Sequence, residues 1–184
     1  LEANTTVIEL VQRTSHKRAE AIARWHRIFV DGWIRGNVQA ALPHAERVLE
    51  IARSIGNPVM EAFYWTGRSM LALRQGDRDG ARPHAAKALE VVGEKGLNFL
   101  GAHAFGLLAN AEPDPSSRRK AMAAGEEVLS RGTPIHNNFT FYDLAIQAAL
   151  GQPAGDERRQ RVGHQIATRG SHQAQHALRQ FGGV

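Results

Sequence analysis

A segment of the chain returns after forty residues, and this recurrence limits the possible folds. The stretch ALPHAERVLE at 41–50 is followed by ARPHAAKALE at 81–90. When residues 25–56 are aligned with residues 65–96, nine of the 32 positions are identical. Self-similarity at a fixed spacing of this length is typical of repeat proteins, in which each unit buries its apolar face against its neighbours. We therefore expect one array of repeats.

The identities combine an aromatic residue, small residues, a proline–histidine step and glycines. They are Trp25/Trp65, Gly36/Gly76, Ala41/Ala81, Pro43/Pro83, His44/His84, Ala45/Ala85, Leu49/Leu89, Glu50/Glu90 and Gly56/Gly96. The same offset places Phe105, Ala121 and Leu129 in a third, weaker copy. The repeat thus continues towards the C-terminus with decreasing similarity.

Each unit has the pattern of two helices. In the first unit, Ile22, Trp25 and Phe29 recur at spacings of three and four, which indicates an amphipathic helix. A second apolar stripe follows from Val38, and the Gly36-Asn37 step between the helices supplies a flexible position and then an N-cap oxygen. The sequence therefore predicts an all-α fold of stacked antiparallel helix pairs.

The turn signals divide the chain into units. We expect a single domain over residues 1–184 with repeat units at about 18–56, 58–96, 98–132 and 135–170. We further expect a leftover or capping helix at 1–13, an irregular helical end from residue 152, and a C-terminal tail or short helix at 171–184. Pro43 and Pro83 lie well inside the expected second helices, where a proline removes a backbone hydrogen bond. Either these helices begin near residues 40 and 80, or both are kinked.

The order of bulky and small residues resembles the tetratricopeptide repeat in its long-helix form. The best match is the second unit, with Trp65, Ser69, Gly76, Ala81, Ala85 and Ala88 at the positions where the motif is bulky or small. In the first unit, Phe29 occupies the position that is small in the motif. The resemblance implies a right-handed superhelix of stacked helix pairs.

A narrower resemblance covers residues 99–146. The segment FLGAHAFGLLANAEPDPSSRRKAMAAGEEVLSRG, followed by IHNNFTFYDLAI, is similar to the C-terminal tetratricopeptide-like region of bacterial signalling proteins that combine a class III adenylate/guanylate cyclase domain with an ATPase module. It implies that any cyclase or ATPase activity belongs to a part of the protein outside this chain. The first residue, Leu1, is not an initiator methionine, and we expect a piece of a longer protein.

The usual catalytic patterns are missing from the sequence. It contains no phosphate-binding Gly-rich loop ending in Lys-Ser/Thr, no His-Glu-x-x-His pair and no cysteine. Among the nine histidines, His172 and His176 have a spacing that metal sites use, but two ligands are too few. His44 and His84 return with the repeat, which favours a packing or capping role. We expect no enzyme activity, no cofactor and no metal.

The resemblance also suggests where a partner binds, because first helices line the concave surface of tetratricopeptide domains. Carried over, these positions are His26, Val30, Trp33, Phe63, Thr66, Met70, Arg74, His103 and Asn110, and Tyr142 is a further candidate. Peptide grooves use such mixtures of aromatic, methionine and arginine side chains. We expect a non-catalytic interaction or regulatory module that binds a protein, a peptide or other domains of its own protein. Alternatively, Trp33, Phe63 and Met70 pack against an adjoining repeat.

The charge raises a second hypothesis. A net charge of +5 and a pI near 10.2 permit nucleic-acid binding, so a nucleic-acid-binding or transcription-regulatory adaptor is the alternative function. The basic residues are scattered, however, and the densest groups, Arg118-Arg119-Lys120 and Arg158-Arg159-Arg161, are interpreted as solvated helix faces. An enzyme that uses the histidines is a third and weaker hypothesis.

The remaining expectations concern location and assembly. No apolar run approaches the roughly 20 residues that span a bilayer, and the chain has no signal-peptide pattern. We therefore expect a cytoplasmic protein with no membrane contact. An exposed face of a terminal repeat is able to pair with a second copy, so a homodimer is one possible assembly.

Overall fold

The computed structural model describes residues 6, 8–11, 16–132 and 135–149. The chain divides into two units, Leu1–Ala154 and Gly155–Val184, and every helix considered below belongs to the first. The C-terminal half of the predicted fourth repeat and the predicted tail at 171–184 lie outside the described residues, as does most of the predicted capping helix. The prediction of one domain over the whole chain therefore remains a prediction.

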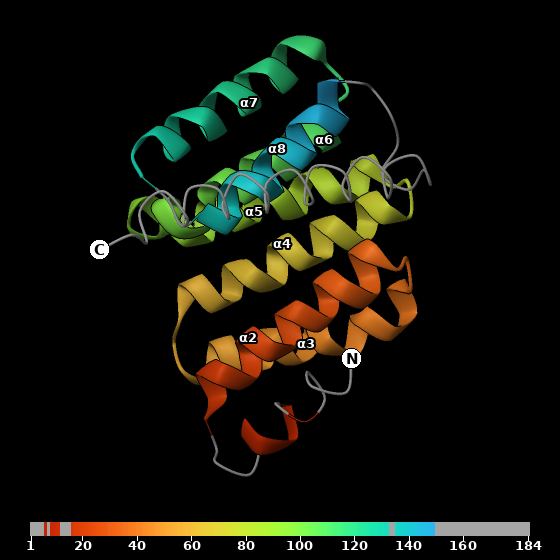
Figure 1. Ribbon diagram of the computed structural model, residues 1–184, viewed down its shortest axis with the longest axis vertical. Helices are drawn as coiled ribbons and strands as arrows, with labels where there is room; N and C mark the ends of the chain where they lie inside the picture. The colour runs from red at the N-terminus through yellow and green to blue at the C-terminus, as the bar shows by residue number, and fades with distance from the viewer. Residues whose placement is uncertain (1–5, 7, 12–15, 133–134, 150–184) are drawn as a thin grey trace, which may run out of the picture. The chain divides into compact units, whose positions relative to one another are not determined.

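The described elements are all helical, which confirms the all-α fold class (Figure 1). In chain order they are α2 (Lys17–Arg27), η1 (Ile28–Ile34), α3 (Val38–Ser54), α4 (Pro58–Arg74), α5 (Arg78–Gly96), η2 (Leu97–Gly101), α6 (Ala102–Ala111), α7 (Pro115–Ser130) and α8 (Ile135–Ala149). The segments η1 and η2 are π-helices that continue or precede an α-helix. Each of the first three predicted units contains one helix pair.

Helices that follow one another in the chain pack side by side and antiparallel. The pairs α2–α3, α4–α5 and α6–α7 are helical hairpins, and α3 also packs on α4 as α5 does on α6. First helices of successive units touch as well, since α4 contacts both η1 and α6, and α6 contacts α8. Sequential antiparallel packing is thus confirmed, whereas the right-handed superhelix remains a prediction.

The second helices α3, α5 and α7 bury equivalent positions at forty-residue spacing. Three sets of small or medium residues are buried: Ala41/Ala81/Ala121, Ala45/Ala85/Gly125 and Val48/Ala88/Val128. The residues two positions after the first set, at 43, 83 and 123, are all exposed. The periodic pattern of the sequence is therefore a periodic pattern of packing, because short side chains allow the two helices of a hairpin to approach closely.

The closest approach of the hairpin helices differs between the first two units. In the second unit, the buried Ser69 hydroxyl donates a hydrogen bond of 3.0 Å to the Ala81 carbonyl oxygen. In the first unit, the expected small position holds Phe29, but Gly32 makes the approach instead. A Cβ at Gly32 would lie 2.9 Å from the Ala41 Cβ and would overlap Leu71 of α4. The helices of the first hairpin still pack closely, because the π-helix η1 places Gly32 against Ala41 of α3.

The predicted turns have the expected conformation. Gly36 and Gly76 adopt φ of 74° and 81°, values that favour glycine, and Asn37 and Asp77 then accept hydrogen bonds from backbone N–H groups three residues later. The helix starts agree with the first alternative for the prolines to within two residues. The helices begin at residues 38 and 78 and continue through Pro43 and Pro83, whose side chains face solvent.

The boundary between the second and third units is earlier than predicted. We expected the break at Gly96, the equivalent of Gly56, but the left-handed conformation belongs to Gly93, with φ of 52°. The π-helix η2 then precedes α6. Asp114 caps α7, because its Oδ2 accepts a hydrogen bond of 2.7 Å from the Ser117 N–H.

Three contacts hold α8 against α6 and α7. The ring of the fully buried Phe141 fills the space above Gly125 of α7 and Gly106 of α6, where any Cβ would crowd it. Asn110 of α6 donates a hydrogen bond of 2.6 Å to the Leu144 carbonyl oxygen. Arg118 of α7 donates to the carbonyl oxygens of Glu112 and Ala148.

Candidate protein-interaction surface

Aromatic rings from the first helices of three successive units meet in one cluster. Trp25 of α2 lies at its centre, with ring centroids 5.9 Å from Phe29 of η1, 5.2 Å from Phe63 of α4 and 5.9 Å from His103 of α6. We call the aromatic cluster the six residues Trp25, His26, Phe29, Phe63, Phe99 and His103, since His26 also contacts Trp25 and Phe99 contacts Phe63. Chain segments nearly eighty residues apart therefore share one set of ring contacts.

The cluster has a buried floor and an exposed rim. Phe63 and His103 are only 6% and 2% exposed, whereas Phe99 is 41% exposed and His26 is also exposed. Rings held by edge and stacking contacts to other rings lose little conformational freedom when a partner packs on them. The rim is thus a preorganised apolar surface of the kind that anchors protein partners.

Two of the rings lie in π-helical segments. Phe29 belongs to η1, where the Arg35 N–H donates a hydrogen bond of 3.1 Å to the Val30 carbonyl oxygen five residues earlier, and Phe99 belongs to η2. One extra residue in a turn rotates the following side chains relative to a regular α-helix, and such turns are frequent at functional sites. In this chain, each of the two π-helical segments contributes one ring to the aromatic cluster.

Towards the end of η1, the apolar surface meets cationic side chains. Trp33 is partly buried against the group that contains Met70 and Leu107, and Ile34 is 47% exposed. Arg74, in the last turn of α4, lies over Gly36: a Cβ at this glycine would be 2.9 Å from Arg74 Nη2. We call Trp33, Ile34, Arg35, Gly36 and Arg74 the Gly36 corner.

The structure separates nine of the ten predicted partner-binding residues into four groups, and the tenth, Val30 of η1, is partly buried. Phe63, Thr66, Met70, His103 and Asn110 are buried, between 0% and 6% exposed. Trp33 and Arg74 are partly buried in the Gly36 corner, and His26 lies on the exposed rim of the aromatic cluster. Tyr142 is 51% exposed on α8 and contacts Phe141 rather than the cluster. The five buried side chains belong to the packing between helices and not to an open surface.

Thr66 and Asn110 are held by local hydrogen bonds. The Thr66 hydroxyl donates to the Phe63 carbonyl oxygen at 3.1 Å, and the Asn110 amide donates to the carbonyl oxygens of Gly106 and Leu144. Their polar groups are therefore satisfied inside the fold. For Phe63 and Met70, the structure agrees with the alternative of packing against an adjoining repeat.

Four members of this surface, of which Phe99 and Ile34 are exposed, are not among the predicted residues. Trp25 and Phe29 were interpreted only as parts of a helix stripe, and Phe99 and Ile34 were not selected at all. Phe99 stands six residues before Phe105, and its side chain reaches Phe63 only because η2 precedes α6. The available signal was the density of large apolar residues in the first helices, which exceeds what one buried stripe requires.

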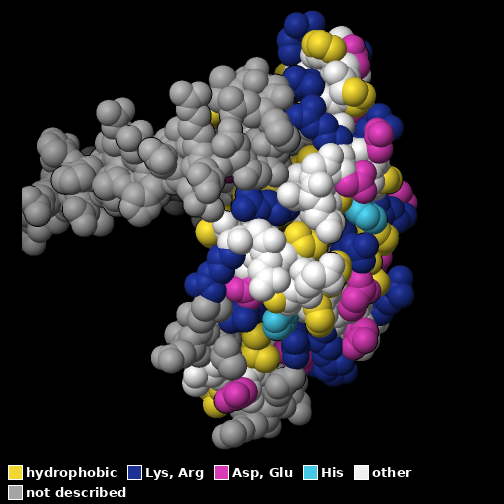
Figure 2. Space-filling view, turned by 90° about the vertical axis from the view of Figure 1, so that its right-hand side faces the viewer, with side chains coloured by type: hydrophobic (Ala, Val, Ile, Leu, Met, Phe, Trp, Pro, Cys, Tyr) yellow, Lys and Arg dark blue, Asp and Glu magenta, His cyan; other side chains and the backbone are white. Residues whose placement is uncertain are grey.

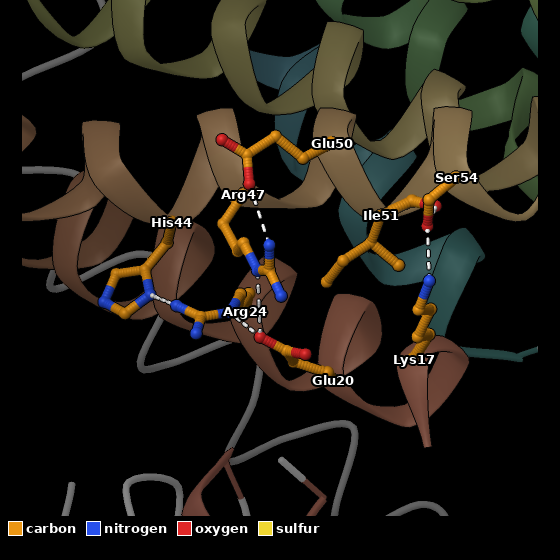
Figure 3. Close-up of polar contacts among 8 residues, drawn as sticks. All are labelled: Lys17, Glu20, Arg24, His44, Arg47, Glu50, Ile51 and Ser54. Carbon is orange, nitrogen blue, oxygen red and sulfur yellow. Dashed lines mark hydrogen bonds and ion pairs between the residues drawn. The ribbon is translucent and has the colours of Figure 1, made fainter. Parts of the chain in front are cut away.

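On the opposite side of α2, a polar network joins it to α3 (Figure 3). Glu20, whose side chain is 5% exposed, accepts hydrogen bonds from Arg24 at 2.8 Å and from Arg47 at 3.2 Å. Burial acts to raise the pKa of Glu20, but the hydrogen bonds and charges of the two arginines more than offset it, so the pKa is lowered. Arg47 continues the network to the exposed Glu50 at 2.9 Å.

The repeated histidines each pack against the first helix of their own unit. The Arg24 guanidinium lies 3.3 Å from His44 Nδ1, and the ring of His84 stacks on Trp65 at 5.6 Å. Burial lowers the pKa of both histidines, and nearby arginines lower it further: Arg24 and Arg27 for His44, Arg68 for His84. Carboxylates of Asp31 and Asp77 act weakly in the opposite sense. These contacts agree with a packing role.

Many basic side chains in the described part of the chain are ion-paired. Arg27 lies 2.8 Å from the buried Asp31, Arg68 lies 2.7 Å from Glu46, and Arg131 pairs with Glu127. Figure 2 shows Lys and Arg side chains interspersed with Asp and Glu over the described part of one face. This neutralisation weakens the field available for a polyanion. Nucleic-acid binding remains an untested alternative without a structural observation in its favour.

The described ranges contain neither a group of metal ligands nor a membrane-spanning helix. No three His, Cys, Asp or Glu side chains gather there as metal ligands would, and none of the described helices is long and apolar enough to cross a bilayer. His172 and His176 lie outside these ranges.

Comparison with known proteins adds no relative. No protein-family model, no curated protein and no solved structure matches this chain.

Proposed function

We propose that this chain is a non-catalytic protein-interaction module that binds a peptide segment on the exposed rim of the aromatic cluster. The segment belongs to a partner protein or to another domain of the same protein. The observation that carries the proposal is that Trp25, Phe63 and His103, from three successive units, meet in one cluster while Phe99 and His26 at its edge remain exposed. A surface assembled from several repeats is able to contact an extended or helical segment along its length.

The aromatic side chains of the cluster favour the binding of a partner at its rim. Aromatic side chains supply most of the free energy at many interfaces, because they bury large areas with few rotatable bonds. Trp25 and Phe63 already contact several rings, so a partner does not have to order them. The large side chain of Phe99 at the rim, which is 41% exposed, is removed from water when the partner binds.

We also propose that the module is a tetratricopeptide-like array of a bacterial signalling protein. The burial pattern shared by α3, α5 and α7 supports a tetratricopeptide-like array, and the small residues at the hairpin contacts support it further. The resemblance of residues 99–146 supports a C-terminal position in a cytoplasmic bacterial signalling protein with a nucleotide cyclase domain. In that arrangement, the module carries out recognition and the chemistry belongs to other domains.

A random peptide display selection tests the proposed function. Enriched peptides are synthesised and titrated against the chain, with the fluorescence of its tryptophans or of a dye on the peptide as the signal. Each peptide is then titrated against His26→Ala and Phe99→Ala, which change the rim, and against Glu50→Ala, which changes an exposed site on α3. Thermal unfolding verifies that each variant is folded.

The proposal predicts that the rim variants bind at least about fivefold more weakly and that Glu50→Ala binds within about twofold of the unchanged chain. Failure to enrich any peptide would count against the proposal. It would also be wrong if the enriched peptides bound the rim variants as tightly as the unchanged chain.

A further inference from the structure

We infer that the bound segment is acidic as well as apolar, with at least one carboxylate seated on Arg35 and Arg74 at the Gly36 corner. This inference rests on the proposed function, because it specifies the chemistry of the segment that the first helices bind. It concerns a different part of the surface from the aromatic rim, so the two are tested by different variants.

Two arginines flank one glycine, one in sequence and one in space. Arg35 directly precedes Gly36, and Arg74 approaches it from α4, with Nη2 2.9 Å and Nε 3.1 Å from where a Cβ would be. The glycine has φ of 74° and no side chain, so nothing at this position covers Arg74. Arg35 and Gly36 are both exposed.

The positive charge at this corner is only partly compensated, through Arg35. Within the described part of the chain, no carboxylate forms an ion pair with Arg74. Arg35 lies 3.4 Å from Asp31 Oδ1, but Asp31 is already paired with Arg27 at 2.8 Å and its side chain is only 7% exposed. An incoming carboxylate therefore finds two cations without displacing an exposed acid.

Among the ion-paired acids, the exposed carboxylates belong to the second helices, and the exposed Asp77 in the turn after α4 accepts a hydrogen bond from the Gly80 N–H. The ion-paired acids with more than half of the side chain exposed lie on α3, α5 and α7: Glu46, Glu50, Asp79, Glu90 and Glu127. The acids of α2 and η1, Glu20 and Asp31, are buried at 5% and 7%. The end of the first helices at the Gly36 corner thus presents positive charge to solvent.

Charge also discriminates between possible occupants. The C-terminal segment 155–184 of this chain contains five arginines and only two acids, so its composition is not that of an acidic segment. A second copy that offers the same corner is repelled by it, because both carry positive charge. An acidic segment is attracted, and its apolar side chains find Ile34 at 47% exposure and the partly buried Trp33 beside the two arginines.

The test uses the peptides enriched in the display selection and the complete chain. The inference predicts an excess of Asp and Glu over Lys and Arg among them. Replacing these acids by Asn and Gln in a synthetic peptide is expected to weaken binding at least about fivefold, as are Arg35→Gln and Arg74→Gln in the chain. The losses should be non-additive between peptide and chain, because they report the same contact. Raising the salt concentration should reduce the advantage of the acidic peptide.

Arg53→Gln is the matched control, because Arg53 is an exposed arginine of α3 and the substitution removes the same charge. It is expected to change the affinity less than about twofold. Arg74 also lies in the last turn of α4, where a cation favours the helix end, so thermal unfolding of Arg74→Gln is measured separately.

The possible failures are distinguishable. Enriched peptides without an acidic excess, or acidic peptides that bind Arg35→Gln and Arg74→Gln as tightly as the unchanged chain, would overturn this inference. The proposed function would still stand if those peptides lost affinity for Phe99→Ala. If no peptide is enriched, both fail together.

Discussion

The Ser69 hydroxyl donates a hydrogen bond to the carbonyl oxygen of Ala81 over 3.0 Å, and neither residue is exposed to solvent. This contact joins α4 directly to α5, the two helices of the second unit. It depends on two small residues twelve positions apart, a spacing that the sequence places within one repeat.

Replacing Ser69 by alanine is expected to reduce the free energy of unfolding by about 1 kcal/mol, because the hydrogen bond is lost in a buried position. Ser69→Leu should reduce it by about 1–3 kcal/mol, since the larger side chain forces the helices apart. Urea unfolding measures both changes. Ser130→Ala removes a hydroxyl from an exposed position on α7 and should change it by less than about 0.5 kcal/mol. Equal effects of Ser69→Ala and Ser130→Ala would contradict the close packing of α4 and α5.

Gly125→Ala is expected to destabilise the chain, although the same change in an open helical position normally stabilises a helix. The reason is that the new Cβ would overlap the ring of Phe141, which is fully buried between α7 and α6. The predicted loss in the free energy of unfolding is about 1–3 kcal/mol. Phe141→Leu in the Gly125→Ala background should recover part of it. A stabilising effect of Gly125→Ala would show that α8 does not pack on this glycine.

The repeated histidines predict a loss of stability in weak acid. The pKa of His44 and of His84 is lowered in the folded chain from an ordinary value of 6.5, so the unfolded chain binds protons first as the pH falls. The contribution of the neutral rings is fully present above 6.5 and is lost as the pH falls from there towards the lowered values. The double variant His44→Gln/His84→Gln should flatten this part of the urea-midpoint profile. A profile that keeps its slope in the double variant would refute this assignment.

Glu20→Gln is expected to cost about 2 kcal/mol at neutral pH, because a buried carboxylate accepts hydrogen bonds from both Arg24 and Arg47. Glu50→Gln removes the exposed end of the same network and should cost less than about 0.5 kcal/mol. The pKa of Glu20 is lowered in the folded chain, so its contribution is present above 4.5 and is lost as the pH falls below that value. Similar costs for Glu20→Gln and Glu50→Gln would be inconsistent with the burial of Glu20.

Much of the fold was predictable because small residues repeat in the sequence. Ala41, Ala81 and Ala121 mark the hairpin contacts, and Gly36 and Gly76 mark the turns, since both kinds of position depend on local backbone geometry. The π-helical segments were not predictable. Their hydrogen bonds shift by one residue, and a shift of this size leaves the spacing of apolar residues almost unchanged. As a result, Gly32 and not Phe29 makes the close approach in the first unit.

The candidate surface was less predictable than the fold. A single repeat does not show how far the first helices of successive units pack on one another, and this packing buries Phe63, Met70 and His103. His26 was selected, and the structure places it on the exposed rim. Phe99 was missed because it precedes the regular part of its helix, where a period of three or four residues gives no signal.

The most direct test of the binding surface is hydrogen–deuterium exchange of the chain with and without a saturating enriched peptide. If the first helices form the binding surface, we expect slower exchange in residues 22–36 and 97–105 and in the last turn of α4. We expect little change in α3, α5 and α7. Protection confined to those second helices, or no protection anywhere despite measurable binding, would contradict the claim that the first helices form the binding surface.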